Sequence, residues 1–314
     1  MIDYFDSIYT QINDANKTLA KFKYYSIQRS FIRLISNLII PCYYLSAKKA
    51  SAFIAPDMCT NRKKNIISLT SFPARINRIW IVIESLFRQT QKPDKIILWL
   101  SRDQFKSIDI LPRKLIEQRD RGLEIKLVEG DIKSHKKYFF CLKEYTDDIL
   151  VTVDDDIIYP TFLLSKLLEY RRIYPQSIIC NRALQITSEM GQVRPYTQWV
   201  SVRRKNEPSF KIFFTSGGGT LFPPYALHKE VLNEEAIKEK SLLADDIWLN
   251  CMGRLNNTTV VKTDYYSICL PLLFLKNRQL KQINLNQRGN DIQLDTVRKH
   301  CLDKYGTDPF KKAL

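Results

Sequence analysis

The chain has 314 residues, 45% of them apolar, which is enough for one large domain or one domain with a smaller appendage. Its formal net charge of +16 indicates an anionic partner, such as nucleic acid, anionic lipid head groups or phosphorylated small molecules, unless the lysines only form a solvated surface. Seven cysteines without paired spacing exclude a readable disulfide framework or zinc knuckle. Without a recognisable secretory signal, we expect reduced thiols and a cytoplasmic protein.

Residues 1–62 differ in pattern from the rest and are predicted to form a basic, amphipathic helical extension. Apolar residues recur at helical spacing from Phe22 to Leu38, with Lys and Arg between them, until Pro41 interrupts the pattern. The apolar run over 34–47 falls short of the roughly 20 residues needed to cross a membrane. Two interpretations stay open: a helical pair packed on the main domain, or a segment lying on an anionic membrane surface.

Residues 63–314 are predicted to form an α/β domain, because continuous apolar runs alternate with amphipathic helical patterns. The predicted strands of the first half are 65–72, 95–101, 123–131 and 148–153, and the predicted helices are 76–90, 111–122 and 161–174. The second half offers shorter apolar runs at 177–180, 210–216, 258–264 and 267–275, and a helix at 242–255. This alternation favours a mostly parallel sheet covered on both faces, with ligands bound beyond the carboxyl ends of the strands.

Three consecutive aspartates, Asp154, Asp155 and Asp156, follow the strand predicted at 148–153. Alternate side chains of an extended segment project the same way, so Asp154 and Asp156 are expected to converge and Asp155 to point elsewhere. Two converging carboxylates suit Mg²⁺ or Mn²⁺, whose coordination shell substrate phosphates commonly complete. The simpler alternative is an acidic turn that caps the next helix, for which one aspartate would suffice.

The segment VTVDDDIIYP (151–160) resembles the strand-terminal DxD motif of nucleotide-sugar-dependent glycosyltransferases of the GT-A fold. The segment SLFRQTQKPDKIILWLS (85–101) is similar to the helix, turn and second strand of bacterial surface-polysaccharide enzymes of that kind. The resemblance covers about residues 65–290. It implies a Rossmann-like GT-A domain, with a mixed, mostly parallel sheet flanked by helices, behind the N-terminal helical appendage. It also implies that Asp154 contacts the nucleotide ribose or the metal, and that Asp156 coordinates the metal bridging the diphosphate.

The same resemblance implies a nucleotide-binding loop within ISLTSFPARI (67–76). The candidates to hold the nucleotide there are Thr70, Ser71, Phe72, Pro73 and Arg75, with Asp155 beside them. Asp131, after the third strand, is expected to contact uracil or ribose, or else to cap its turn. Lys137 is expected to stabilise charge on the departing nucleotide, with Lys136 and His135 as alternatives. A solvated basic helix end is the simpler interpretation of these lysines.

Gly217, Gly218 and Gly219 stand in a row, and consecutive glycines let the backbone approach a ligand closely. The resemblance implies that they border the donor sugar, and a hairpin turn is the alternative. Asp245 and Asp246 begin the helix predicted at 242–255. Sugar transfer to a hydroxyl needs a base, and the resemblance implies Asp246 for that role, with Asp245 as its neighbour or as a helix cap.

Two further expectations concern the acceptor side and the end of the domain. Trp248 is expected to pack against the acceptor sugar. The polar residues 276–290 are expected to close over the diphosphate as a lid.

Together these assignments predict a metal-dependent glycosyltransferase, specifically a hexosyltransferase that uses Mn²⁺ or Mg²⁺. The expected donor is a nucleotide sugar, in particular a UDP-sugar, and the expected acceptor is a growing bacterial surface glycan such as capsule or lipopolysaccharide. A lipid-linked acceptor would place the enzyme peripherally at the inner face of the cytoplasmic membrane. There are two alternatives. One is a Mg²⁺-dependent nuclease or nucleotidyltransferase, which the dispersed basic residues disfavour. The other is a non-catalytic glycan-assembly protein, which the intact acidic clusters disfavour.

Overall fold

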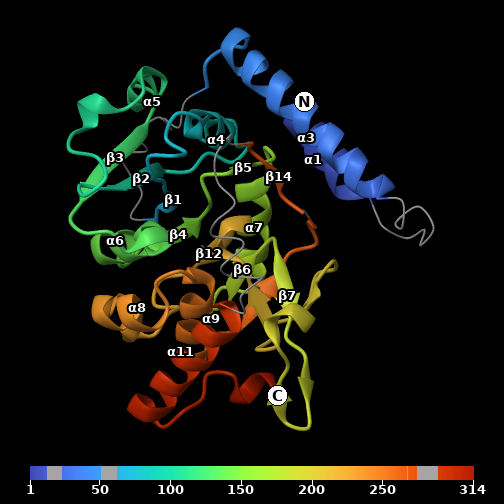
Figure 1. Cartoon of the computed structure of the whole chain (residues 1–314), viewed down its shortest axis with the longest axis vertical. Coiled ribbons are helices and arrows are strands. Elements are labelled where there is room, and N and C mark those ends of the chain that lie inside the picture. Colours follow the sequence, from blue (N-terminus) through green and yellow to red (C-terminus); the bar gives the residue numbers. More distant parts are fainter. Residues whose placement is uncertain (13–22, 51–61, 267, 274–288) are drawn as a thin grey trace.

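A central sheet of seven strands organises the chain, whose computed structural model describes residues 1–12, 23–50, 62–266, 268–273 and 289–314 (Figure 1). The order across the sheet is β13-β6-β12-β4-β1-β2-β3, and β12 is antiparallel to both of its neighbours while the other pairs are parallel. The strands are β1 (Asn65–Thr70), β2 (Lys95–Ser101), β3 (Leu123–Val128), β4 (Ile149–Thr152), β6 (Ile178–Cys180), β12 (Thr220–Phe222) and β13 (Val260–Lys262). The predicted class, a mixed and mostly parallel sheet flanked by helices, is confirmed, and it is a Rossmann-like arrangement.

Helices cover both faces of this sheet, so its central strands are apolar on both sides. In β1, Ile67 and Leu69 face one core while Ile66 faces the other, and all three are fully buried. The first core includes residues of α4 (Ile79–Phe87), α5 (Arg113–Arg119) and α7 (Leu163–Ile173). The second includes residues of α6 (Lys136–Glu144), α8 (Glu234–Lys240), α9 (Asp245–Leu255) and α11 (Gly289–Tyr305). Burial on two sides is why these strands are continuous apolar runs in the sequence.

Three smaller sheets are separate from the central one. The antiparallel pair of β5 (Ile157–Ile158) and β14 (Leu270–Pro271) lies next to α4, and a three-stranded sheet has the order β10-β7-β11. Its strands are β7 (Ala183–Gln185), β10 (Val200–Ser201) and β11 (Ile212–Phe214). A two-stranded hairpin joins β8 (Ser188–Glu189) to β9 (Gln192–Val193). Short 3₁₀ turns occur at 108–110, 133–135, 196–198, 216–218, 229–232 and 311–313.

The N-terminal helices α1 (Ile2–Gln11) and α3 (Tyr24–Ser46) pack on the main domain, as one of the two sequence interpretations expected. The Asn37 side chain donates to the Pro271 carbonyl at 2.9 Å and accepts from the Leu273 N–H at 2.8 Å. The expectation that Pro41 ends the helical pattern is wrong, because α3 continues through it to Ser46. Proline removes one helical N–H donor, and packing of the surrounding turns offsets that loss.

The boundary predicted at residue 62 follows the segment 51–61, which lies outside the described residues, so the two-part division stays a prediction. No helix within the described ranges is long and apolar enough to pass through a membrane.

Candidate active site

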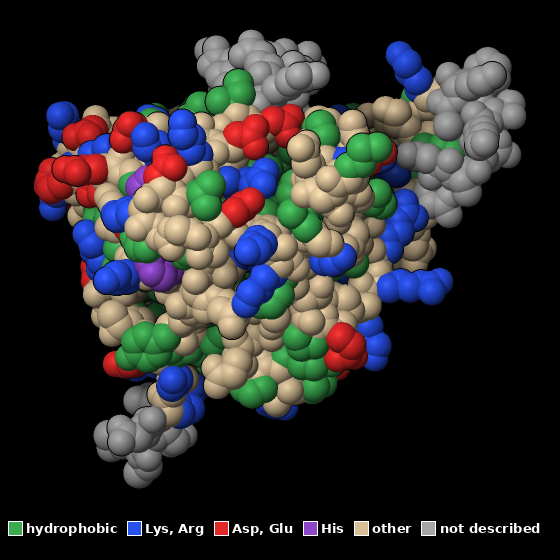
Figure 2. Space-filling model, turned by 90° about the horizontal axis from the view of Figure 1, so that it is seen from below, with side chains coloured by type: hydrophobic (Ala, Val, Ile, Leu, Met, Phe, Trp, Pro, Cys, Tyr) green, Lys and Arg blue, Asp and Glu red, His purple; other side chains and the backbone are tan. Residues whose placement is uncertain are grey.

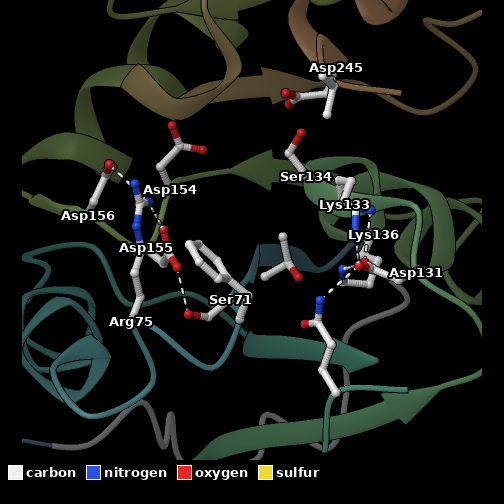
Figure 3. A pocket seen from close by; sticks show the side chains of 14 residues that line it. Ser71, Arg75, Asp131, Lys133, Ser134, Lys136, Asp154, Asp155, Asp156 and Asp245 are labelled. Atoms are coloured by element: carbon white, nitrogen blue, oxygen red, sulfur yellow. Dashed lines mark hydrogen bonds and ion pairs between the residues drawn. The ribbon is translucent and has the colours of Figure 1, made fainter. Parts of the chain in front are cut away.

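A pocket of about 440 Å³ opens at the carboxyl ends of the parallel strands (Figure 3). Ser71 follows β1, Gln104 follows β2, Asp131 follows β3 and Asp154 follows β4, so one edge of the sheet brings them together. The lining residues are Thr70, Ser71, Phe72, Arg75, Gln104, Asp131, Lys133, Ser134, Lys136, Asp154, Asp155, Asp156, Leu243 and Asp245. Pockets of this size bind cofactor-sized ligands in other proteins.

The acidic triplet lies in this pocket and is held by the loop after β1. Ser71 Oγ donates to Asp155 at 2.6 Å, and the Arg75 guanidinium contacts both Asp155, at 2.5 Å, and Asp156, at 2.9 Å. Asp154 faces Lys137 instead, so Asp155 does point away from Asp154, although all three aspartates line the pocket (Figure 3). Burial raises the pKa of Asp155 in spite of Arg75. Burial and the neighbouring Asp154 raise the pKa of Asp156 to about 6.

Lys137 joins the triplet to the second acidic pair. Its Nζ lies 2.7 Å from Asp154 Oδ1 and 2.8 Å from Asp245 Oδ2, and its side chain is only 2% exposed. Burial alone would lower the pKa of Lys137, but Asp154 and Asp245 outweigh burial and raise it. In turn, Lys137 lowers the pKa of Asp245 in spite of burial. Lys137 therefore lies behind the pocket wall as a fixed positive charge between two carboxylates, and Lys136 is the neighbour that lines the pocket.

Replacing Lys137 with Met is expected to destabilise the fold by about 3 kcal/mol, the cost of leaving a buried carboxylate without its partner. Urea denaturation of the purified protein measures this. Lys143→Met is the matched control, because Lys143 belongs to the same helix and is exposed. Equal stability of the two variants would show that Lys137 does not hold the acidic groups together.

The opposite end of the pocket is built around Asp131. Its carboxylate accepts hydrogen bonds from Gln104 Nε2 at 2.8 Å, from Lys133 N at 3.0 Å and from Lys133 Nζ at 2.6 Å, and it also pairs with Lys136. These donors lower the pKa of Asp131 in spite of burial. Since the amide nitrogen of Gln104 faces this carboxylate, its Oε1 atom faces away, and it accepts no hydrogen bond from the residues that the structure describes. This oxygen is inaccessible to solvent, so it belongs to the wall behind the pocket.

Gln104 is a residue that sequence reasoning missed. Its position just beyond the predicted strand 95–101 was the available signal, because ligands of parallel sheets contact the segments that follow the strands. Ser134, Lys133 and Leu243 also line the pocket without having been expected there.

The second acidic pair lies at the first turn of α9 and is tied to the Gly-rich segment. Ser216 Oγ donates to Asp245 Oδ2 at 2.8 Å, and the Ser216 N–H donates to Asp246 Oδ1 at 2.7 Å. Burial and the negative charge of Asp245 raise the pKa of Asp246 to about 7. The expectation for Trp248 is wrong: this side chain is fully buried, and its Nε1–H donates to the Val231 carbonyl at 3.2 Å. Trp248 is a core residue and is closed to an acceptor.

The Gly-rich segment passes directly over the triplet. A Cβ atom at Gly217 would lie 1.7 Å from Asp154 Oδ2, and one at Gly218 would lie 2.5 Å from the Cβ of Arg182. Gly219 has φ +89°, in the region that side chains disfavour. Glycine is therefore required here by close approach to Asp154, although Gly217, Gly218 and Gly219 are buried and lie outside the pocket lining. Pro73 is exposed and likewise outside the lining.

Replacing Gly217 with Ala is expected to displace Asp154 and to reduce metal-dependent activity by at least about 100-fold, as loss of one electrostatic contact at the transition state does. The comparison is Gly191→Ala. Gly191 has positive φ (+74°), which Gly217 does not have, but no atom lies within 4 Å of an added Cβ there, so this variant introduces backbone strain without a clash. Activity assays and thermal melting of both variants separate backbone strain from the clash. Full activity of the Gly217 variant would contradict the required proximity to Asp154.

The donor set of the triplet fits a hard divalent cation. No group of three or more His, Cys, Asp or Glu within the described ranges could surround an ion unaided. Asp154 and Asp156 supply two carboxylates whose side chains are 39% and 35% exposed, so oxygen ligands from a substrate and from water can approach them. Mg²⁺ and Mn²⁺ are bound in this manner, by one or two carboxylates together with substrate phosphates.

Residues 276–288 of the expected lid lie outside the described residues, while Asn290 belongs to the first turn of α11.

The fold and pocket define a Rossmann-like α/β protein with a charged site at the strand ends. No protein-family model matches the sequence, and no curated protein matches it. Among solved structures, the chain is similar to the mannosyltransferase PcManGT from Pyrobaculum calidifontis in complex with GDP-Man and Mn²⁺, with 12% identity and a TM-score of 0.47 over 99% of this chain and 79% of that chain. It is also similar to 4-diphosphocytidyl-2C-methyl-D-erythritol synthase, with 14% identity and a TM-score of 0.40 over 71% of this chain and 97% of that chain. At these identities the activity has to be argued from the site.

Proposed function

We propose that the chain is a metal-dependent glycosyltransferase that uses a nucleotide-sugar donor. The observation that carries the proposal is the pairing of two acidic clusters across Lys137. One cluster, Asp154 to Asp156, fits a divalent cation with an incomplete shell, and the other contains Asp246, whose pKa of about 7 suits a general base at neutral pH. A pocket that leads from these carboxylates to hydrogen-bonding groups at Asp131 has room for a nucleotide.

We place the diphosphate of the donor at one end of the pocket and its nucleoside at the other. Asp154 and Asp156 would hold a divalent ion, which when bound neutralises charge on a departing diphosphate. Ser71 and Arg75 fix Asp155, so that the triplet keeps its place without the ligand. At the far end, Thr70 and Phe72 would border the nucleoside.

The acceptor side is formed around the first turn of α9. Asp246 takes the proton of the acceptor hydroxyl as the new oxygen–carbon bond forms and the bond from the anomeric carbon to the diphosphate oxygen breaks. Ser216 orients Asp246 through its backbone N–H, and Asp245 remains ionised against Lys137. Burial, together with the negative charge of Asp245, keeps the pKa of Asp246 high enough for it to retain a proton after transfer.

Finer assignments complete the proposal. The donor is a UDP-sugar carrying a hexose, and the acceptor is a hydroxyl of a bacterial surface glycan on a lipid carrier. These assignments rest on the likeness of the DxD segment to nucleotide-sugar glycosyltransferases and of the segment 85–101 to enzymes of bacterial surface-polysaccharide assembly. A lipid carrier implies work at the inner face of the cytoplasmic membrane.

A nucleic-acid substrate is disfavoured by the distribution of charge. On the face shown in Figure 2, Lys and Arg side chains are scattered among acidic and hydrophobic ones. A protein that follows a phosphate backbone gathers its basic side chains in a stripe or patch.

A panel of nucleotide sugars incubated with the protein and Mn²⁺ tests the proposal. Release of a nucleoside diphosphate from one of them, abolished by EDTA and restored by Mn²⁺, is the expected result. Single-stranded and duplex nucleic acids form the second arm of the same assay. If the protein cleaves nucleic acid and releases no nucleoside diphosphate from any nucleotide sugar, the proposed function is wrong and the protein is a nuclease.

A further inference from the structure

Helix α3 carries a second apolar face that does not pack against the part of the chain that the structure describes. Its inner side, with Asn37, Ile40 and Tyr44, is buried against the domain. On the opposite side, five large apolar side chains are between 52% and 64% exposed. They are Ile27, Phe31, Leu34, Leu38 and Leu45, called here the outer stripe. Their separations of 4, 3, 4 and 7 residues place them on one line along the helix.

The outer stripe is long and uninterrupted by charge. Helix α3 has 23 residues, so it extends for about 35 Å, and Figure 1 shows it along one edge of the molecule. Its sequence contains neither Asp nor Glu. Isolated exposed apolar residues need no explanation, but an aligned series of this length marks an interaction surface.

Charge decides between the possible occupants of this surface. Lys23 lies at one end of α3, and Lys48 and Lys49 lie just beyond the other end, and all three are exposed. The whole chain carries a net charge of +16. A second copy would bring the same positive charge against the helix, whereas anionic lipid head groups complement it. An apolar line with lysines at its margins and no acidic group is the pattern of a helix that lies in the plane of a membrane surface.

We propose that α3 docks the protein on an anionic membrane surface. The outer stripe enters the boundary between head groups and acyl chains, and the terminal lysines contact lipid phosphates. The inner face stays packed on the domain, so docking requires no unfolding of α3. This inference does not depend on the catalytic assignment.

Vesicle flotation of the full chain tests the docking. Probes are phosphatidylcholine vesicles with and without phosphatidylglycerol, at about 0.1 M salt, where the Debye length is near 10 Å. The wild type is expected to float only with the anionic vesicles. The variant Phe31→Ser/Leu38→Ser is expected to lose binding by at least about 100-fold, since two inserted apolar side chains are removed.

The matched control is Ile110→Ser/Ile173→Ser, because these side chains are 62% and 61% exposed and lie outside α3. It is expected to bind as the wild type does. Thermal melting confirms that both variants fold, and sedimentation without vesicles reports the oligomeric state. Absence of flotation, equal flotation of both variants, or a dimer that dissociates only in the α3 variant would overturn membrane docking.

Discussion

Replacing Asp246 with Asn is expected to reduce donor turnover by at least about 1000-fold, because the acceptor hydroxyl then has no base to receive its proton. Asn keeps the shape of the side chain and can still accept the Ser216 N–H, so folding should change little. The measurement is kcat/KM for release of nucleoside diphosphate. Nucleotide affinity should stay within about twofold, since Asp246 lies outside the pocket lining.

The pH profile adds an independent readout to this variant. Burial and Asp245 place the pKa of Asp246 at about 7, and a base must be unprotonated to act. Wild-type kcat/KM is therefore expected to fall about tenfold per pH unit below about 7 and to level off above it. Asp303→Asn, an exposed change on α11, should keep this profile. If the Asp246 variant keeps the wild-type turnover, or keeps the same fall of kcat/KM below about pH 7, Asp246 is not the base.

Replacing Asp156 with Asn is expected to weaken the apparent Mn²⁺ affinity at least about tenfold and to lower turnover at least about 100-fold. The physical reason is the loss of one of two anionic oxygen donors. The raised pKa of Asp156, about 6, reflects its burial beside Asp154, and the Asn variant relieves this repulsion. The folded protein should therefore be at least as stable as the wild type above about pH 6, which separates loss of metal from loss of fold.

The apparent Mn²⁺ affinity of the Asp156→Asn variant is measured by assaying its activity at increasing Mn²⁺ concentration. The Asp246→Asn variant is measured in parallel for comparison. The Asp246 variant should bind Mn²⁺ and nucleotide normally and fail in chemistry, whereas the Asp156 variant should fail at binding. An Asp156 variant with the wild-type metal dependence would show that the triplet is not the metal site.

The strands of the sheet could be predicted from the sequence, because a strand that is buried on both faces is a continuous run of apolar residues. The runs at 65–72, 95–101 and 123–131 correspond to β1, β2 and β3. The residues of β1 and β2 are largely inaccessible to water, whereas the edge strand β3 buries Leu123 and Ile125. Charged residues just after such runs identified the edge where the pocket lies, since parallel strands bring their carboxyl ends together. For this reason the sequence predicts that Ser71, Asp131 and Asp154 lie at this edge, and all three line the pocket.

What could not be predicted depends on contacts between distant segments. Continuation of α3 past Pro41 depends on packing against the segment around Leu273, and no local pattern indicates this. Trp248 faces the core because of the angle at which α9 packs, and its neighbour Val231 lies 17 residues earlier. The link between Asp154 and Asp245 through Lys137 joins three elements, and helical spacing says nothing about it.

The central claim is that the carboxylates after β4 hold a divalent ion jointly with the diphosphate of a nucleotide. Isothermal titration of nucleoside diphosphates into the wild-type protein, with and without Mn²⁺, tests it most directly. The predicted result is that one nucleoside diphosphate binds at least about tenfold more tightly with Mn²⁺ than without it. Affinity that is unchanged by Mn²⁺, or no binding of any nucleoside diphosphate, would contradict the claim.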